Sequence, residues 1–285
     1  MKIGCMLWRI GERLNFFSQL DWVRDNRFDE VSFWSFPGDS ERWRGFDLVA
    51  SAQSDLHRLK DALSGIAEVD IHAPSAPWSD LDTGLTSPDP AARQQALDQL
   101  QRLLERCAHI GAKVLTLHPG RHPDLGTAAW RQRTADSLLQ AECLAREFGV
   151  RIGLELTSDY DLAMMPSCPN IGLTVDTGHM QFKDGAGYRA FGSLGALIER
   201  LGPRVFHMHL HDYDGKLDHL AIGDGKIDFH QILQALIQIH YNGSLCLELN
   251  PDVVSPEGIL HSRTALKKML DDLSPNTGHG GRHGS

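Results

Sequence analysis

The sequence predicts an α/β protein that folds as a single (β/α)8 TIM barrel. Short apolar or β-branched runs, eight in all, alternate with longer helical patterns from one end of the chain to the other. No internal linker interrupts this alternation, and 285 residues suit one barrel domain, since α/β barrels reach about 250 residues as one unit. The hydrophobic share of 41% and the charged share of 23% are those of an ordinary globular chain, which excludes disorder over most of the length.

The expected strands are short segments rich in Val, Ile, Leu and aromatic residues. They cover residues 2–8, 30–34, 68–72, 113–118, 151–156, 171–176, 205–211 and 244–250. Because helical segments separate most of them, neighbouring strands are expected to be parallel, as in repeated βαβ units. Eight strands are the number that closes this kind of barrel.

The expected helices carry their apolar residues on one face. They cover residues 16–26, 52–66, 91–110, 126–148, 189–201, 228–241 and 257–273. In the third of these, the apolar residues recur at three- and four-residue steps: Ala96, Leu97, Leu100, Leu103, Leu104 and Cys107. Pro90 stands at its start, where a helix tolerates proline, and Gly111 follows as a stop signal. Gly149 and Gly243 mark the ends of two further helices.

One barrel domain is expected to span residues 1–273. The alternative is an open, doubly wound sheet, but no Gly-x-Gly-x-x-Gly segment follows the first strand. The remaining residues, 274–285, are Gly-rich, polar and without periodicity, and we expect them to form a disordered C-terminal tail.

The net charge is −9, from 37 acidic and 28 basic residues with His neutral. This balance lacks the strongly basic footprint of nucleic-acid-binding domains, so nucleic acid is not the expected partner. No stretch approaches the roughly 20 apolar residues of a membrane helix, and Arg9, Glu12 and Arg13 interrupt the apolar N-terminal run. Neither membrane insertion nor a secretory signal is therefore expected.

The five cysteines are odd in number and include no Cys-x-x-Cys pair. They are Cys5, Cys107, Cys143, Cys168 and Cys246. A disulfide framework and a thiolate zinc site are therefore both poorly supported. A reducing cytoplasm is the expected location.

Chemistry-bearing side chains gather at one end of the predicted barrel. Active sites of this fold lie at the C-terminal ends of the strands. Six consecutive strands end in or next to an imidazole or a carboxylate: His72, His118, Glu155, Asp176 with His179, His209, and Glu248. A lone histidine at such a position is more often a hydrogen-bonded core residue, but several carboxylates gathered without a cation would raise one another's pKa. Imidazole and carboxylate together suit a divalent metal, so the joint pattern predicts a metal site.

A long loop follows the seventh strand. It is rich in Asp and Gly, and a loop of this length at the catalytic end of a barrel is usually functional. It brings His219 back to the rim. The acidic residues of this region are expected to serve turns and helix capping: Asp212, Asp214, Asp224 and Asp228.

The ordered succession of these segments resembles the xylose isomerase-like barrel superfamily. That superfamily joins sugar isomerases and epimerases to the endonuclease IV class of DNA-repair enzymes. The segments that carry the resemblance are His72-Ala73-Pro74, Leu117-His118-Pro119-Gly120, Gly153-Leu154-Glu155, Val175-Asp176-Thr177-Gly178-His179, His209-Leu210-His211-Asp212, His219 to Gly225, and Leu247-Glu248.

The ketose epimerase branch of this superfamily implies one divalent metal ion (Mn, Co, Mg or Zn) held by Glu155, Asp176, His209 and Glu248. It also implies that Glu155 and Glu248 are catalytic and move a proton at the substrate carbon through an enediolate. The leading interpretation is a metal-dependent isomerase or epimerase that acts on a small-molecule sugar or sugar-like keto or polyol substrate. The residues expected to bind substrate are His72, His118, His179 and His219, with Trp8 and Trp34 either forming an apolar wall or only packing in the core.

The endonuclease IV branch implies instead up to three zinc ions and phosphodiester cleavage at abasic DNA. Its further ligands map to His72, His118, His179 and His219. However, Leu217 stands where that class has an Asp, with Asp218 displaced by one position, and no Lys/Arg cluster lies near a rim loop. Lyase or dehydratase chemistry on keto-sugars and a non-catalytic binding role are further alternatives. The sequence leaves a homo-oligomer open, and the lack of a phosphate-binding nest favours an unphosphorylated substrate.

Overall fold

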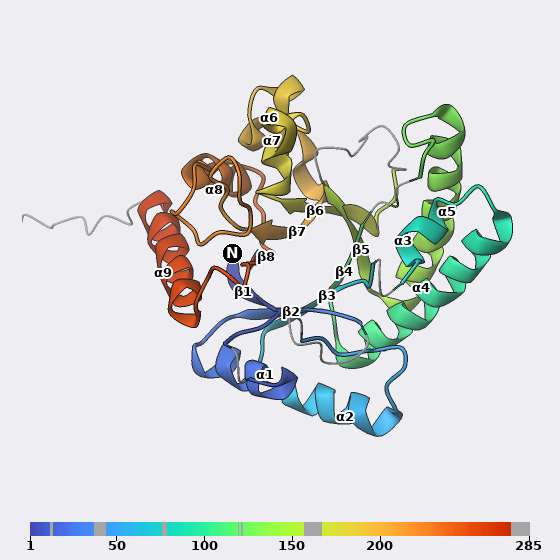
Figure 1. Cartoon of the computed structure of the whole chain (residues 1–285), viewed down its shortest axis with the longest axis horizontal. Helices are drawn as coiled ribbons and strands as arrows, with labels where there is room; N and C mark the ends of the chain where they lie inside the picture. The colour runs from blue at the N-terminus through green and yellow to red at the C-terminus, as the bar shows by residue number, and fades with distance from the viewer. Residues whose placement is uncertain are drawn as a thin grey trace, which may run out of the picture.

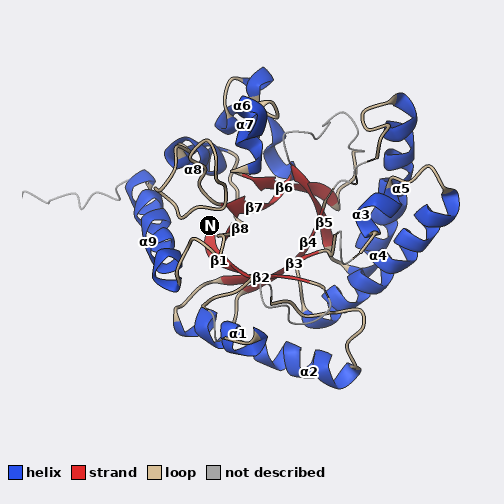
Figure 2. Ribbon diagram, in the orientation of Figure 1, coloured by secondary structure: helices blue, strands red, loops and turns tan. Residues whose placement is uncertain are grey.

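The computed structural model describes residues 1–11, 14–36, 44–75, 79–118, 120, 122–156 and 167–274. Eight strands in these residues form a closed barrel in chain order, and helices surround it (Figure 1 and Figure 2). The strands are β1 (Lys2–Leu7), β2 (Glu30–Trp34), β3 (Glu68–His72), β4 (Val114–Leu117), β5 (Arg151–Leu156), β6 (Ile171–Asp176), β7 (Val205–Leu210) and β8 (Ser244–Leu247). The expected single (β/α)8 barrel is confirmed.

The strands of the barrel are parallel throughout, and pairing of β1 with β8, which places Lys2 opposite Ser244, closes it. Helices cover the outer face of such a barrel and packed side chains fill its interior, so its strands read as nearly continuous apolar runs. Every residue of β6 and of β7 is buried. The buried polar residues on these strands therefore point to a functional or structural site within the barrel.

The outer layer consists of helices of very different lengths. They are α1 (Phe16–Asp25), α2 (Gln53–Ala62), α3 (Leu81–Leu85), α4 (Pro90–Ile110), α5 (Ala128–Phe148), α6 (Phe182–Gly185), α7 (Leu194–Leu201), α8 (Phe229–Gln238) and α9 (Pro256–Leu273), with short 3₁₀ helices η2 (His179–Gln181), η3 (Arg189–Phe191) and η4 (Gly202–Arg204). The expected helix over 189–201 is wrong as a single element. Gly192, with a φ of 89°, separates η3 from α7, and the Ser193 side chain caps α7 by accepting a hydrogen bond from the Ala196 N–H.

Local sequence sets the bounds of α4. Asp89 caps its N-terminus by accepting a hydrogen bond from the Ala91 N–H at 2.9 Å, and Pro90 occupies the first helical position. Gly111 ends the helix with a left-handed φ of 82°. The six apolar residues that predicted this helix are 0% to 6% exposed, so the predicted face is the one that packs on the barrel.

Several site residues lie just beyond the strands that were expected to contain them. Trp8, His118, His211 and Glu248 directly follow β1, β4, β7 and β8. These strands end one to three residues earlier than expected, because the chain leaves the regular ladder there to enter the loops of the barrel mouth. Side chains at these positions can therefore reach the mouth.

The C-terminal helix α9 ends at Leu273. Residues 275–285, which make up the expected disordered tail apart from Ser274, lie outside the described residues. Across the part of the chain that the structure describes, no helix combines the length and the apolar character needed to cross a membrane.

Candidate active site

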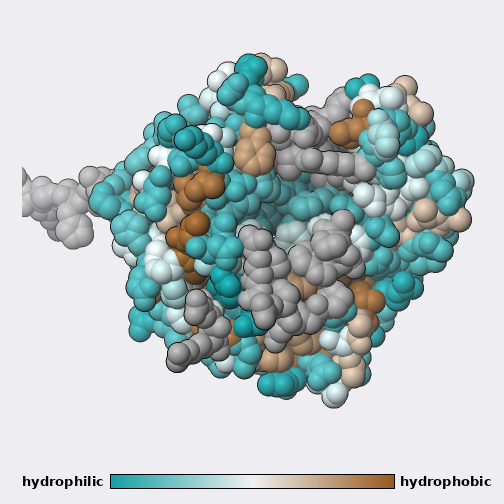
Figure 3. All heavy atoms as spheres, viewed as in Figure 1, coloured by the Kyte–Doolittle hydropathy of each residue, from teal (hydrophilic) through white to brown (hydrophobic). Residues whose placement is uncertain are grey.

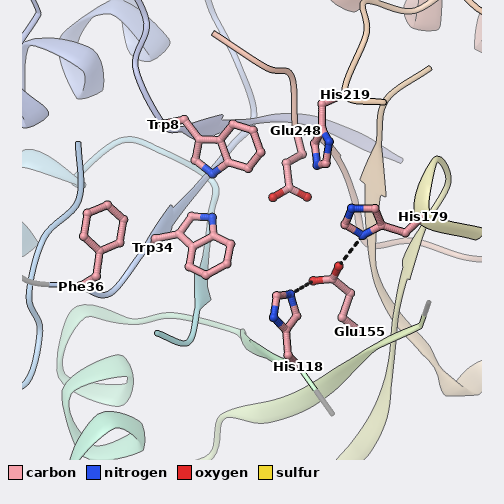
Figure 4. Close-up of a pocket in the computed structure, with 8 residues that line it drawn as sticks. All are labelled: Trp8, Trp34, Phe36, His118, Glu155, His179, His219 and Glu248. Carbon is pink, nitrogen blue, oxygen red and sulfur yellow. Dashed lines mark hydrogen bonds and ion pairs between the residues drawn. The ribbon is translucent and has the colours of Figure 1, made fainter. Parts of the chain in front are cut away.

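A cavity of about 240 Å³ opens at the C-terminal ends of the strands. The surface is hollowed at the centre of the face seen in Figure 3. Eight described residues line the cavity, and Figure 4 shows their side chains: Trp8, Trp34, Phe36, His118, Glu155, His179, His219 and Glu248. Seven of them are residues that the sequence predicted for the site. Phe36 was missed, although its position two residues after Trp34 was a signal for a shared face.

Glu155, at the end of β5, lies at the centre of the site. Its Oε2 is 3.0 Å from His72 Nε2 and 3.0 Å from His118 Nε2, and its Oε1 is 3.1 Å from His179 Nδ1. The carboxylate is 1% exposed, so these imidazoles rather than water satisfy it. Three different strand ends therefore converge on one carboxylate.

These contacts decide which groups carry charge. Burial would raise the pKa of Glu155, but the charge of His118 and the hydrogen bonds from the surrounding histidines outweigh it and hold the pKa well below its ordinary value. Burial lowers the pKa of His72, whereas at His118 the charge of Glu155 outweighs burial and raises the pKa. His118 is thus the more readily protonated of the two histidines.

The second carboxylate, Glu248, faces His209. Glu248 Oε2 lies 2.8 Å from His209 Nδ1, which in turn lies 3.7 Å from Glu155 Oε2. Burial would raise the pKa of Glu248, but the charge of His209 lowers it to about 2. Neither ring nitrogen of His209 nor Glu248 Oε2 has the geometry of a hydrogen bond, although all three atoms are buried. Buried polar atoms are rarely left in this state, and a cation among them would satisfy them.

The donor set therefore fits a divalent metal ion. Glu155, Asp176 and His209 each offer a ligand atom within 4.8 Å of the other two, and Glu248 adjoins this group through His209. The ligand atoms are carboxylate oxygens and an imidazole nitrogen, and Zn²⁺ and other divalent transition-metal ions bind both types of atom. The structure thus brings the four predicted ligands into one neighbourhood.

His211 holds Asp176 in place, a role that the sequence did not reveal. Its Nε2 lies 2.8 Å from Asp176 Oδ1, and its Nδ1 accepts the backbone N–H of His219 at 2.7 Å. The second contact fixes the tautomer, because Nδ1 must be bare and Nε2 must carry the proton that Asp176 accepts. The rings of His211 and His219 stack with centroids 3.8 Å apart. Strand alternation put His211 on the same face as His209, but only the folded loop shows its second partner.

The loop between β7 and α8 is built around Asp212. Its carboxylate accepts hydrogen bonds from four backbone N–H groups, those of Tyr213, Gly223, Gly225 and Ile227. Asp214 accepts from the N–H groups of Lys216 and Leu217, and Asp228 caps α8. The expected turn and cap roles of these three aspartates are confirmed.

The aromatic residues form one side of the cavity. In Figure 4, Trp8 and Trp34 lie beside each other and face the two glutamates across the cavity. The Trp34 ring stacks on His72 with centroids 3.5 Å apart and an interplanar angle of 10°. His72 is 1% exposed and is absent from the described residues that line the cavity, so it lies behind Trp34 and supports Glu155 rather than facing the open space.

Two further groups of possible metal ligands adjoin this centre. In each group, one ligand atom per residue lies within 4.8 Å of the others: His72, His118 and Glu155 form one group, and Asp176, His179, His211 and His219 form the other. Asp218 lies 3.3 Å from His219 Nδ1 and 3.7 Å from His179 Nε2 through its two carboxylate oxygens. Leu217, which stands at the position where the endonuclease IV class has an aspartate, is 55% exposed. Asp218, one position later, nevertheless lies within reach of both histidines.

Comparison with known proteins decides the family. Residues 20–269 match the family model described as the xylose isomerase-like TIM barrel. The chain belongs to this family. The chain is 26% identical to D-psicose 3-epimerase of Ruminiclostridium cellulolyticum over 233 residues, and the match covers 72% of this chain and 74% of that protein.

The chain is similar to a protein of the endonuclease 4 kind as well as to a sugar epimerase. The chain is 24% identical over 201 residues to a probable endonuclease 4 of Chloroflexus aurantiacus, covering 63% of this chain and 68% of that protein. The crystal structure of D-psicose 3-epimerase with D-tagatose from Clostridium cellulolyticum H10 superposes with a TM-score of 0.74 at 19% identity, covering 95% of this chain and 99% of that one. At this level of identity, the superposition shows that the two chains share a fold.

Proposed function

We propose that this protein is a metal-dependent isomerase or epimerase that acts on an unphosphorylated sugar or a sugar-like keto or polyol substrate. The observation that carries the proposal is the pair of buried glutamates, Glu155 and Glu248, which line one small cavity and are each held as a carboxylate by neighbouring imidazoles. A volume of about 240 Å³ is smaller than most drug-binding pockets and suits a monosaccharide-sized ligand. The similarity to D-psicose 3-epimerase supports the same class of substrate.

One divalent ion, Mn, Co, Mg or Zn, would be held by Glu155, Asp176, His209 and Glu248. When bound, such an ion supplies a Lewis acid that stabilises negative charge on a substrate oxygen. The support for this assignment is the donor set and the buried atoms of His209 and Glu248 that lack hydrogen bonds.

The two glutamates would move the proton. One carboxylate removes it from the substrate carbon next to the carbonyl, and the other returns it to the opposite face or to the neighbouring carbon. His118 and His179 line the cavity beside Glu155 and can donate hydrogen bonds to hydroxyl groups. Trp8 and Trp34 would cover the apolar side of the sugar and exclude water, and His72 would orient Glu155 from behind.

Solvent exchange tests this proposal. The metal-loaded protein is incubated with a panel of unphosphorylated ketopentoses and ketohexoses in D₂O, and deuterium incorporation and products are followed by NMR. Deuterium should enter at the carbon next to the carbonyl, and Glu155→Gln or Glu248→Gln should slow the exchange by roughly 10²- to 10⁴-fold. The exposed Glu147→Gln on α5 is the matched control. Near-normal exchange in either variant at full metal occupancy would refute the catalytic roles.

A second candidate function rests on the His72, His118 and Glu155 group and on Asp218 beside His179 and His219. These groups would suit a multinuclear zinc phosphodiesterase that acts on abasic DNA, and the similarity to a probable endonuclease 4 agrees with it. Incision of an oligonucleotide with one abasic site by the zinc-loaded protein decides between the two functions. We expect no incision above that of a chelator-treated sample, and zinc-dependent incision without sugar turnover would favour the hydrolase.

A further inference from the structure

A second group of buried polar side chains lies inside the barrel, one layer below the candidate active site. His207 and Cys246 each precede a proposed metal ligand, His209 and Glu248, by two positions. Because alternate residues on a strand share a face, both point into the barrel interior. Glu30, the first residue of β2, joins them, and all three are 0% exposed. None of the three is among the described residues that line the cavity above.

Gly4 makes room for this group. In the barrel register Gly4 of β1 pairs with Glu30 on one side and with Cys246 on the other. A Cβ atom at Gly4 would lie 1.2 Å from Glu30 Oε2, so the carboxyl group of Glu30 occupies the space that any side chain there would fill. The missing side chain on β1 therefore lets groups from β2 and β8 approach each other inside the barrel.

The oxygens of Glu30 and the ring nitrogens of His207 have polar neighbours but no hydrogen bond of ordinary geometry, and Ser32 and Cys246 lie beside the Glu30 carboxyl group. His207 Nδ1 does lie 3.1 Å from Asp70 Oδ2, and the Val114 N–H anchors the other oxygen of that carboxylate at 2.9 Å. One nitrogen of His207 thus faces a fixed carboxylate and the other remains for another partner. Buried polar groups in this state are rare in native proteins, and a bound ion is one way to satisfy them.

We propose that Glu30, His207 and Cys246 form a metal site inside the barrel that prefers Zn²⁺. One ligand atom of each residue lies within 4.8 Å of those of the other two. Zinc takes carboxylate, imidazole and thiolate ligands at about 2.0–2.3 Å, so small side-chain rotations bring these atoms to an ion between them. Metal-ligating histidines commonly face a carboxylate with their other nitrogen, as His207 faces Asp70. On binding, the S–H bond of Cys246 breaks, an S–Zn bond forms, and the proton leaves to solvent.

The position of the group indicates a structural rather than a catalytic ion. The group contains one residue from each of β2, β7 and β8. Strand β2 lies on one side of the β1–β8 pairing that closes the barrel, and β7 lies on the other side, next to β8. Since the ligands are fully buried, the ion enters while the chain folds, and it contributes to the stability of the closed barrel. Such a site was not predictable from the sequence, because the three residues are far apart in the chain and no Cys-x-x-Cys pair is present.

Cobalt spectroscopy tests the proposal on the full-length protein. The protein is produced or refolded with Co²⁺, and its thiolate-to-cobalt charge-transfer absorption is measured in the near ultraviolet. The proposed ligands of the active site contain no sulfur, so a thiolate band must come from a cysteine outside that site, and the variants show which one. We expect the band in the wild type and its loss in Cys246→Ser. Cys5→Ser is the matched control, because Cys5 is also a buried free cysteine but lies on the neighbouring position of β1 that faces away from the interior.

Zinc X-ray absorption on the unmutated protein covers the case in which Cys246→Ser does not fold. A zinc–sulfur contribution in protein produced with zinc supports the site. The proposal is overturned if the metal-loaded wild type shows neither a thiolate–cobalt band nor a zinc–sulfur contribution. It is also overturned if the cobalt band survives in Cys246→Ser and disappears in Cys5→Ser. Neither result bears on the proposed sugar chemistry, which is measured separately by solvent exchange.

Discussion

His211 shows how one side chain can link a proposed metal ligand to a loop. It donates to Asp176 and accepts from the backbone of His219, whose φ of 53° is left-handed. We predict that His211→Ala weakens metal binding by roughly 10- to 100-fold, because Asp176 loses the partner that orients it. Calorimetric titration with Mn²⁺ measures the change, and the exposed His230→Ala on α8 is the control. Unchanged affinity in His211→Ala would contradict the assignment of Asp176 as a ligand.

His209 gives metal binding a defined dependence on pH. Burial would lower its pKa, but the charge of Glu248 raises it to about 9 in the metal-free protein. A metal needs the neutral imidazole, so binding at pH 7 must displace a proton, and the apparent affinity should fall about tenfold for each unit below pH 9. Calorimetry in buffers of different ionisation enthalpy counts the released protons. About one proton at pH 7 and fewer at pH 10 are expected, and heats that do not depend on the buffer at pH 7 would contradict His209 as a ligand.

At the scale of elements, the loop from β7 to α8 depends on one carboxylate. Asp212 satisfies four backbone N–H groups, and Gly225 can approach it only without a side chain, since a Cβ there would lie 2.3 Å from Asp212 Oδ1. Asp212→Asn turns an amide NH₂ toward part of these donors and should destabilise the protein by about 2 kcal/mol. Urea denaturation measures this loss, and faster amide exchange over residues 213–227 would locate it. Asp214→Asn, in an exposed turn, should behave like the wild type, and equal effects of the two changes would contradict the anchoring role.

Elements were predictable from sequence where local signals agree. Helix α4 has a capping Asp89, Pro90 at its first position, a buried face with helical spacing and Gly111 at its end, and all four signals point to the same bounds. The break between η3 and α7 was not predictable from the apolar spacing alone. Gly192 and Ser193 interrupt it with a left-handed turn and a new cap, which compete with helix continuation.

At the scale of the whole molecule, barrel closure explains which parts of the site the sequence could reveal. The fold places every strand end on one rim, so residues such as Glu155, His209 and Glu248 could be assigned to one site from their strand positions alone. The contacts of Asp218 with two histidines depend on the path of a long loop. The interior group around Cys246 depends on the register of strands that are distant in sequence. Neither leaves a local pattern in the chain.

In the proposed function, Glu155, Asp176, His209 and Glu248 hold one metal ion in a site that binds a sugar. Anomalous scattering at the zinc edge, recorded on crystals grown with zinc, locates the ion. We expect a peak beside Glu248, about 2.0–2.4 Å from the four ligand atoms, and no strong peak between His72 and His118. A peak among Glu30, His207 and Cys246 would belong to the interior site. A strong peak between His72 and His118, or ligand side chains that point apart across the barrel, would contradict the single-metal site and favour a multinuclear hydrolase.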